Sequence, residues 1–226
     1  MNKSVFDSIA EEYNEQREKM DRGERYCFEI IKDYLYFYGI KPYSGVDLGI
    51  GSGYFMRMFL REYVNLKIVG VDISNPMLCE ARNYLSEFIN RVHLVCGDIR
   101  RMNFKNEKFD IVISSLTIHH LNDRDKKKVI KVVKKILKKG GLCIIWDKFT
   151  TSNKIDSLYH SIWKKRMMGQ GITAEEIIKI EKRRRYDKLI CLNRFIRMLE
   201  RSGFVRVNTP YKDLGMSLII GERGII

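Results

Sequence analysis

Short apolar runs alternate with longer amphipathic stretches along most of the chain. Apolar residues that recur at intervals of three and four predict helices over residues 6–18, 25–38, 54–63, 76–89 and 125–138. The short apolar runs predict strands over residues 45–48, 67–71, 92–95, 109–114 and 142–146. Strands that alternate with helices in this way favour a mostly parallel sheet with helices on both faces, so the sequence predicts an α/β, doubly wound fold.

The alternation breaks at residues 151–185, which are helical in pattern, aromatic and basic. After this insertion, residues 192–201 predict a helix, and residues 205–209 and 216–221 predict two closing strands. A chain of 226 residues is long enough for one sizeable core. We therefore expect a single domain over residues 1–226, with an N-terminal helical cap at 1–40 and a helical substrate lid at 151–190.

The insertion has the features of a mobile lid. Gly169 and Gly171 are placed to form a hinge between two helical segments. Basic residues at 164–166 and 182–185 indicate an exposed face. The side chains expected on its buried face are Leu158, Ile162 and Trp163. An open sheet end cannot exclude water from a reaction without such a cover.

Three glycines in five residues separate the first predicted strand from the next helix, in the stretch VDLGIGSG. Gly49, Gly51 and Gly53 allow a sharp turn and a close approach of the backbone to a ligand. Ligands of doubly wound folds lie beyond the carboxyl ends of the strands, which is where this turn falls. A dinucleotide-binding turn would need a further glycine at Tyr54, and the GK[ST] of a phosphate-binding loop is absent, so the sequence disfavours both.

Acidic residues stand at the ends of the first three predicted strands. Asp47 precedes the glycine turn, Asp72 ends the second strand and Asp98 follows the third. A carboxylate at Asp72 suits the two hydroxyls of a ribose, and one at Asp98 suits an exocyclic amine such as that of adenine. Taken alone, Asp72 and Asp98 could be helix N-caps or turn residues. Together with the glycine turn, they favour a ligand that contains a nucleoside.

Five motifs between about residues 44 and 148 carry a family resemblance: VDLGIGSG, VDIS, GDIR, FDIVISSLTIHHL and LKKGGLCIIWD. Their order and spacing resemble those of the class I S-adenosylmethionine (SAM)-dependent methyltransferases. The resemblance implies an enzyme with SAM as its cofactor, and a seven-stranded sheet in the order 3-2-1-4-5-7-6 with strand 7 antiparallel. It leaves the acceptor of the methyl group open.

The resemblance also implies a set of cofactor contacts. The glycine turn would pass beneath the methionine part of SAM, and the three aspartates would meet its ammonium group, its ribose and its adenine amine in turn. An aromatic residue near the N-terminus would close over the cofactor, although it could instead pack between helices. The residues implied are Tyr13, Arg17, Asp47, Gly49, Gly51, Gly53, Asp72, Ile73, Asp98, Ile99 and Ser114.

Methyl transfer requires chiefly that the acceptor is aligned with the methyl group and that water is excluded. A base is needed only where the acceptor carries a proton. His119 and His120 follow the fourth predicted strand and are the candidate catalytic residues, or else simply part of the loop architecture. Tyr159, His160 and Trp163 are the candidates for acceptor binding, or else the apolar underside of the lid.

The acceptor is predicted to be a small molecule, with RNA as the alternative. The formal net charge is +14, but much of it falls on the solvent face of the helix predicted at 125–138. Residues 114–141 are similar to enzymes that methylate wobble uridines of tRNA, and residues 160–204 are loosely similar to carboxy-SAM synthases of that modification. A tRNA-directed or carboxy-SAM synthase-like enzyme, a protein methyltransferase and a non-catalytic SAM-binding protein therefore stay open.

Five cysteines are scattered through the chain without a CxxC pair, which indicates reduced thiols in a cytoplasmic protein. This spacing offers no zinc site, and the sequence predicts no metal. No apolar run approaches the roughly 20 residues needed to span a bilayer, so we expect no membrane partner. The oligomeric state cannot be predicted from these patterns.

Overall fold

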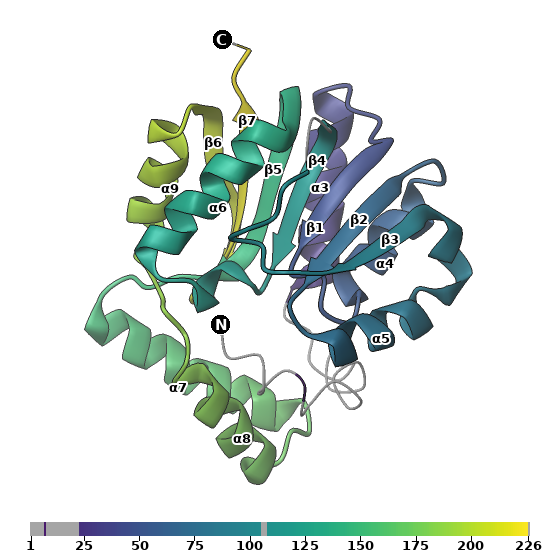
Figure 1. The fold of residues 1–226 in the computed structure, drawn as a ribbon. Coiled ribbons are helices and arrows are strands. Elements are labelled where there is room, and N and C mark those ends of the chain that lie inside the picture. Colours follow the sequence, from purple (N-terminus) through teal and green to yellow (C-terminus); the bar gives the residue numbers. More distant parts are fainter. Residues whose placement is uncertain (1–6, 8–22, 105–107, 226) are drawn as a thin grey trace.

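The computed structural model describes Asp7 and residues 23–104 and 108–225. Its centre is a seven-stranded sheet in the order β3-β2-β1-β4-β5-β7-β6 (Figure 1). The first five of these strands are parallel, and β7 runs antiparallel to β5 and β6, which confirms the predicted fold class. The strands are β1 (Ser44–Leu48), β2 (Lys67–Asp72), β3 (Val92–Cys96), β4 (Phe109–Ser115), β5 (Leu137–Lys148), β6 (Phe204–Asp213) and β7 (Met216–Arg223).

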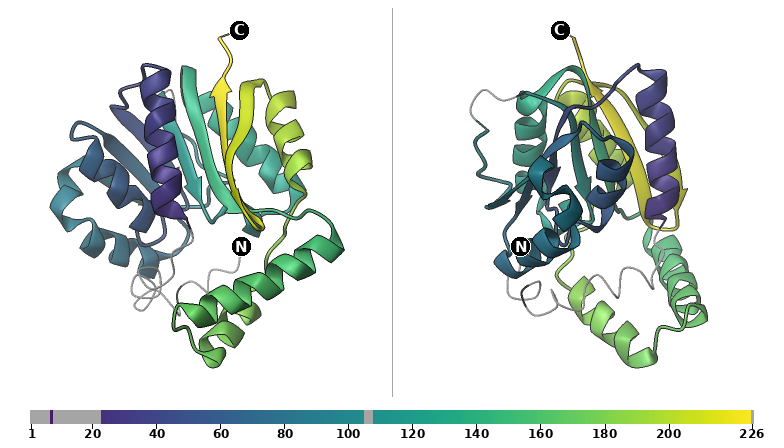
Figure 2. Two further views of the ribbon diagram at one scale, coloured as in Figure 1. Left: turned by 180° about the vertical axis from the view of Figure 1, so that it is seen from behind. Right: turned by 90° about the vertical axis from the view of Figure 1, so that its right-hand side faces the viewer.

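Helices cover both faces of the sheet (Figures 1 and 2). The helices α6 (Asp123–Ile136) and α9 (Leu192–Arg201) pack on one face. The other face is covered by α3 (Glu24–Phe37), α4 (Tyr54–Glu62) and α5 (Asn75–Tyr84). These helices turn apolar stripes toward the strands, as their spacing predicts. Each fully buried large apolar side chain in these two cores contributes about 1.5–3 kcal/mol by burial.

The strand β1 lies at the point where the order of the strands reverses, because β2 pairs with one edge of it and β4 with the other. In an open parallel sheet, the connections diverge at such a point and leave a crevice beyond the carboxyl ends of the strands. The glycine turn after β1 and the loop after β4 therefore lie on the two sides of this crevice.

Two element boundaries differ from the predicted ones. The helix expected at 125–138 gives way at Leu137 to β5, because Leu137 is fully buried in a pair with the first residue of β4. The helix expected at 76–89 ends earlier and is followed by a 3₁₀ helix, η1 (Ser86–Arg91). Leu85 lies between them and is also fully buried. In both places, the burial of a leucine overrides the helical pattern of the sequence.

The insertion is a hairpin of two helices, α7 (Asn153–Gly169) and α8 (Ala174–Arg184). Gly171 between them has a φ of +82°, a left-handed conformation that glycine adopts without strain. Thr173 and Glu176 then form a capping box that starts α8. The hairpin has a small core of its own, which consists of Met167, Ile172 and Ile177 with the partly buried Trp163 and Ile180.

The hairpin leaves the sheet and returns to it at one point, because Thr150 and Cys191 form an isolated parallel bridge. Figure 2 shows the hairpin beyond the carboxyl ends of the strands. Arg166 of α7 makes two bonds of 2.8 Å to the carboxylate of Asp213 at the end of β6. Leu158, which the sequence places on the buried face, is instead 52% exposed, because it lies on the side of α7 opposite the hairpin core.

The helix expected at 6–18, with Tyr13 and Arg17, lies outside the described residues apart from Asp7. Of the cap expected at 1–40, the structure describes α3, which packs on the sheet through a fully buried apolar stripe. In the part of the chain that the structure describes, no helix is both long and apolar enough to cross a membrane.

Lys126 of α6 is a charged residue that is only 1% exposed. Its ammonium group donates hydrogen bonds to the carbonyl oxygens of Leu121 and Lys188. These bonds tie the loop after β4 to the segment that returns from the hairpin. Burial lowers the pKa of Lys126, and nearby carboxylates oppose that change.

We expect Lys126→Met to lower the free energy of unfolding by about 1–3 kcal/mol, because it removes the donor from two carbonyl groups. Thermal unfolding followed by circular dichroism measures the change. Lys127→Met, at an exposed position of the same helix, is the matched control and should unfold like the unchanged protein. Equal melting temperatures for the two variants would contradict the prediction.

Candidate active site

The turn after β1 holds its three glycines in left-handed conformations, with φ of +84° at Gly49, +55° at Gly51 and +83° at Gly53. A β-carbon on Gly49 would lie 2.2 Å from the hydroxyl oxygen of Thr117, so the turn packs directly against the loop after β4. At Gly51, no heavy atom of the described residues lies within 4 Å of the place of a β-carbon. The backbone at Gly51 therefore borders open space, which a turn that approaches a ligand requires.

A pocket opens between this turn, the start of α4 and the loop after β4. Residues predicted from the sequence line part of it, namely Asp47, Gly49, Gly51, Asp72 and His120. Its lining also includes residues that were not predicted from the sequence, among them Ile50, Ser52, Tyr54, Ser115, Leu116 and Thr117. Most of these have ordinary apolar or hydroxyl side chains, so only their position beyond a strand end could have revealed them.

Asp47 brings a carboxyl group into the interior of the protein. It is 2% exposed, and its Oδ1 atom has no hydrogen-bond partner among the described residues. Burial and the nearby Asp72 raise the pKa of Asp47 to about 8. A buried acceptor that lines a pocket without a partner suits a ligand with a cationic donor, such as an ammonium group.

Asp72 is 7% exposed at the end of β2 and accepts hydrogen bonds from two backbone amides. The amide of Gly51 donates to Oδ2 at 2.9 Å, and that of Ser74 donates to Oδ1 at 3.0 Å. Burial raises the pKa of Asp72, and these amides oppose the rise. Because each carboxylate oxygen can accept a further bond, Asp72 can fix the turn and still receive the hydroxyl groups of a ligand.

Asp98 follows β3 and is held by Arg100, whose Nε atom lies 2.8 and 2.9 Å from its two oxygens. Arg100 also bonds Asp125 at 3.1 Å, and its guanidinium lowers the pKa of Asp98. Ile99 is buried in the core, and Ile73 is partly buried in the turn after β2. Asp98, Ile73 and Ile99 are not among the described residues that line the pocket, so their contacts with adenine stay predictions.

Ser114 lies within the sheet. Its hydroxyl donates to the carbonyl oxygen of Leu48 at 2.9 Å, and the residue is 3% exposed. The next residues, Ser115 and Leu116, line the pocket, and Leu116 has a φ of +52° just past the end of β4. Both faces of a central parallel strand are buried, so the apolar pattern cannot show which of two adjacent serines faces the crevice. The contact of Ser114 with a cofactor stays a prediction.

His119 and His120 lie in a short 3₁₀ helix, η2 (Ile118–His120), after β4. His119 is 3% exposed, and its Nδ1 atom lies 2.5 Å from Asp147 Oδ1, while its backbone amide donates to Asp147 Oδ2 at 3.1 Å. His120 lines the pocket, and burial lowers its pKa to about 2. The structure thus separates the two candidates, since His120 borders the pocket and His119 is bonded to β5.

Two aspartates beside these histidines were not predicted from the sequence. Asp147 lies in β5, and Asp187 lies in the segment that follows α8. An oxygen of Asp187 is 3.5 Å from His119 Nε2 and 3.6 Å from His120 Nδ1, and Lys148 bonds its other oxygen at 2.9 Å. Asp147 ends an apolar run, as Asp72 does, and this position could have revealed it. Asp187 belongs to no motif.

Tyr159, His160 and Trp163 lie on α7 and are not among the described residues that line the pocket. His160 Nε2 is 2.9 Å from a carboxylate oxygen of Glu181, and its ring stacks on Trp163 with the centroids 5.6 Å apart. The guanidinium of Arg184 lies 4.7 Å from the centre of the Trp163 ring, and burial lowers its pKa. Arg184 is thus drawn into the hairpin instead of lying on a fully exposed basic face. Acceptor binding by the three α7 residues stays a prediction.

Solved structures show the same fold. An O-methyltransferase family protein from Burkholderia thailandensis has a TM-score of 0.66 at 18% identity, over 90% of this chain and 58% of that one. This chain therefore spans little more than half of that protein. A chain from the complex between the Haloferax volcanii Trm112 methyltransferase activator and a putative methyltransferase has a TM-score of 0.68 at 17% identity, over 100% of this chain and 99% of that one.

Comparison by sequence finds relatives of the same kind as comparison by structure. The carboxy-S-adenosyl-L-methionine synthase of Staphylococcus epidermidis is 28% identical over 215 residues, which are 91% of this chain and 90% of that protein. A family model described as a methyltransferase domain matches residues 46–141. In these residues and in its fold, the chain is similar to the class I SAM-dependent methyltransferases. The pocket fits SAM, because Oδ1 of Asp47 is a buried acceptor without a partner among the described residues and Gly51 leaves room beside it.

We expect Gly49→Ala and Gly51→Ala to differ in effect. Both positions have positive φ, so alanine costs about 1–2 kcal/mol at either one. Only Gly49→Ala also places a methyl group 2.2 Å from Thr117, which should cost about 1–3 kcal/mol more. Thermal unfolding should show the difference, and calorimetry should show that Gly51→Ala weakens SAM binding in a folded protein. Equal melting temperatures would mean that the turn does not pack on Thr117.

Proposed function

We propose that this protein transfers a methyl group from SAM to a small-molecule acceptor. The observation that carries the proposal is the pocket beyond β1 and β4. There, an oxygen of Asp47 that has no partner among the described residues and the carboxylate of Asp72 flank the open turn at Gly51. The match of residues 46–141 to a methyltransferase domain supports SAM as the ligand of this pocket. The hairpin of α7 and α8 beyond the strand ends supports an enclosed acceptor site, with 151–190 as its lid.

On this proposal, Asp47 accepts a hydrogen bond from the ammonium group of the cofactor, and Asp72 binds the ribose hydroxyls. Asp98 would receive the adenine amine at the next strand end along the sheet, with Ile73 and Ile99 against the base. When bound, SAM supplies a methyl group on a sulfonium, which is already a strong electrophile. The chain itself must therefore align the acceptor and exclude water.

The acceptor side of the site would lie between η2 and the hairpin. His120 lines the pocket at the end of β4, so the reacting atom of an acceptor would lie beside its ring. The segment after α8 is bonded to η2, since the amide of Lys188 donates to the carbonyl oxygen of His119 at 2.6 Å. This bond supports the hairpin as the cover of the same site, to which Trp163 would contribute an aromatic face.

The placement of charge favours a small acceptor over RNA. Two basic side chains of the hairpin are engaged within the protein, because Arg166 bonds Asp213 and Arg184 lies over Trp163. Many of the remaining lysines lie on α6, which covers a face of the sheet and not the end that holds the pocket. An RNA bound at the pocket would therefore meet only part of the excess charge.

A carboxy-SAM synthase is the second candidate. It is favoured by the relative from Staphylococcus epidermidis, because the similarity extends over 90% of that protein and is not confined to the methyltransferase domain at 46–141. Such an enzyme would need a cation for the added carboxylate, and the partly buried guanidinium of Arg184 is a group of that kind.

Two measurements on the purified protein distinguish these functions. Mass spectrometry of the nucleoside that co-purifies would find SAM for a methyltransferase, or a species one carboxyl group heavier for the synthase. Incubation with methyl-labelled SAM and fractionated cell extract then identifies the acceptor. Label in a small-molecule fraction supports the proposal, and label in RNA overturns it. SAM binding without any transfer would indicate a non-catalytic SAM-binding protein.

SAM binding should release a proton from Asp47 near neutral pH. Because the pKa of Asp47 is raised to about 8, its carboxyl group is protonated in the free protein below that pH and must ionise to pair with an ammonium group. Affinity should therefore rise as the pH increases from about 6 to about 8. Calorimetry in buffers of different ionisation enthalpy measures the released proton, which Asp47→Asn should abolish. If the unchanged protein releases no proton, Asp47 does not meet the ammonium group.

Trp163→Ala should lower the rate of label transfer by about 100-fold, because small displacements of an aligned acceptor have effects of this size. SAM affinity, measured by calorimetry, should stay unchanged, since Trp163 lies outside the cofactor pocket. Met168→Ala, at a 57% exposed position of the same helix, is the matched control and should leave both quantities unchanged. Loss of SAM binding in a folded Trp163→Ala protein would place α7 in the cofactor site.

A further inference from the structure

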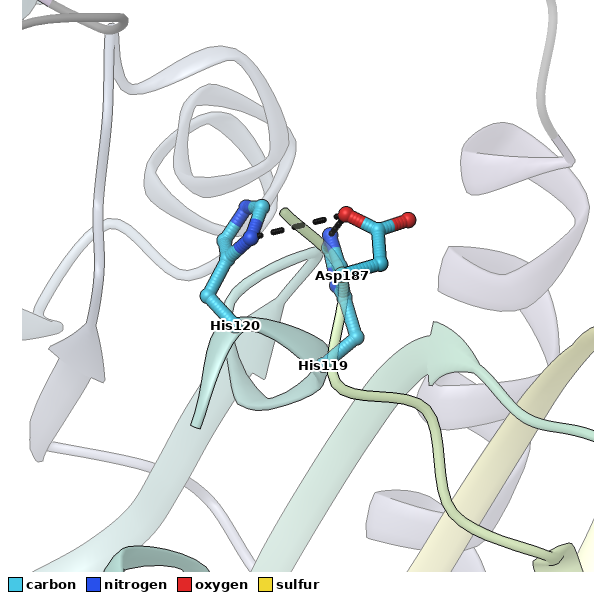
Figure 3. A group of neighbouring side chains, drawn as sticks. All are labelled: His119, His120 and Asp187. Atoms are coloured by element: carbon cyan, nitrogen blue, oxygen red, sulfur yellow. Dashed lines mark ion pairs between the residues drawn. The ribbon is translucent and has the colours of Figure 1, made fainter. Parts of the chain in front are cut away.

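Three side chains with metal-binding atoms converge beside the pocket (Figure 3). His119 Nε2, His120 Nδ1 and a carboxylate oxygen of Asp187 all lie within 4.8 Å of one another. Their side chains are 3%, 12% and 4% exposed, so they are largely shielded from bulk water. The histidines come from η2 and the aspartate from the segment after α8, so only the folded hairpin brings the three together.

The two separations from Asp187 match those between the ligands of one metal ion. Oδ1 of Asp187 is 3.5 Å from His119 Nε2 and 3.6 Å from His120 Nδ1. Hydrogen bonds between nitrogen and oxygen are typically about 2.7–3.2 Å long. Ligand atoms bound at about 2.0–2.2 Å to a tetrahedral ion lie about 3.3–3.6 Å apart. The gap between these side chains is therefore wide for direct hydrogen bonds and suited to an ion.

Neighbouring groups orient two of the ligands. With Nδ1 of His119 donating to Asp147 Oδ1, 2.5 Å away, a neutral imidazole presents the lone pair of Nε2 to Asp187. Lys148 bonds the other oxygen of Asp187 at 2.9 Å, which leaves Oδ1 toward the histidines. A histidine that binds a metal through one ring nitrogen commonly donates a hydrogen bond from the other ring nitrogen to a carboxylate. A cation between the facing lone pairs would also remove their repulsion.

We propose that His119, His120 and Asp187 bind a divalent transition-metal ion, such as zinc, next to the cofactor pocket. Two imidazoles and a carboxylate are a donor set that zinc accepts, and three protein ligands leave at least one position open. No metal was predicted from the sequence, because the cysteines lack a metal-binding spacing and Asp187 is distant from the histidines in the chain and belongs to no motif.

The open position gives the ion a part in methyl transfer, and this step rests on the proposed function, whereas metal binding itself does not. His120 borders both the ion and the pocket, so an oxygen, nitrogen or sulfur atom of the acceptor could bind there. A bound hydroxyl or thiol would lose its proton to solvent at a lower pH. The anion would then form a bond to the methyl carbon, while the carbon–sulfur bond of SAM breaks and its electron pair passes to sulfur.

Titration with Co²⁺ tests the site, because Co²⁺ with nitrogen and oxygen ligands absorbs visible light. Protein freed of metal by a chelator should bind Co²⁺ saturably, and Zn²⁺ should displace it. His120→Ala and Asp187→Asn should each weaken binding at least about 10-fold, and Asp147→Asn, which acts through His119, about 10- to 100-fold. The matched control, His93→Ala, is at an exposed position of β3 and should bind like the unchanged protein.

Every protein in this series carries Cys79→Ser and Cys96→Ser, because these exposed thiols could bind the ions by themselves. Circular dichroism shows which variants are folded, and the isosteric Asp187→Asn carries the test if His120→Ala is not. Unaltered Co²⁺ affinity in a folded ligand variant, or no saturable binding by the parent protein, would overturn the inference. Calorimetry with SAM on the same samples keeps the two proposals apart, since loss of SAM binding with an intact metal site would count against the proposed function alone.

Discussion

The buried contact between His119 and Asp147 joins three parts of the molecule that are distant in the chain. The side-chain bond of 2.5 Å fixes the loop after β4 to β5, and the carbonyl oxygen of the same histidine accepts a bond of 2.6 Å from the amide of Lys188. A carboxylate that is fully buried is tolerated only where it has partners, so this contact leaves little freedom in the loop. The wall of the pocket and the return of the hairpin both depend on it.

The fold could be predicted because short apolar runs and helical patterns alternate along most of the chain, with residues 151–185 as the main break. The pattern failed where tertiary burial outweighed local preference. Leu137 continues the helical spacing of α6, yet it starts β5, because it is fully buried there opposite the first residue of β4. Leu85 ends α5 for a related reason.

The proposed cofactor side of the site was easier to predict than the proposed acceptor side. Asp47, Gly51 and Asp72 stand at strand ends, and the sheet brings strand ends together whatever the side chains are. Whether Ser114 or Ser115 lines the pocket depends on which side chain of β4 points toward it. The apolar pattern cannot show this for a strand that is buried on both faces. Asp187 reaches the histidines only through the path of the hairpin, which no local pattern encodes.

The bridge between Thr150 and Cys191 places the two ends of the inserted segment side by side. Such a segment can be exchanged, lengthened or shortened as a unit during evolution, because neither the register of β5 nor the position of α9 depends on its length. The strands β1, β2 and β4 lie outside this segment, and the loop after β4, which is part of the pocket wall, is bonded to it through Lys188. On the proposed function, a change in this segment would alter the acceptor side of the site and leave the strands around the cofactor pocket in place.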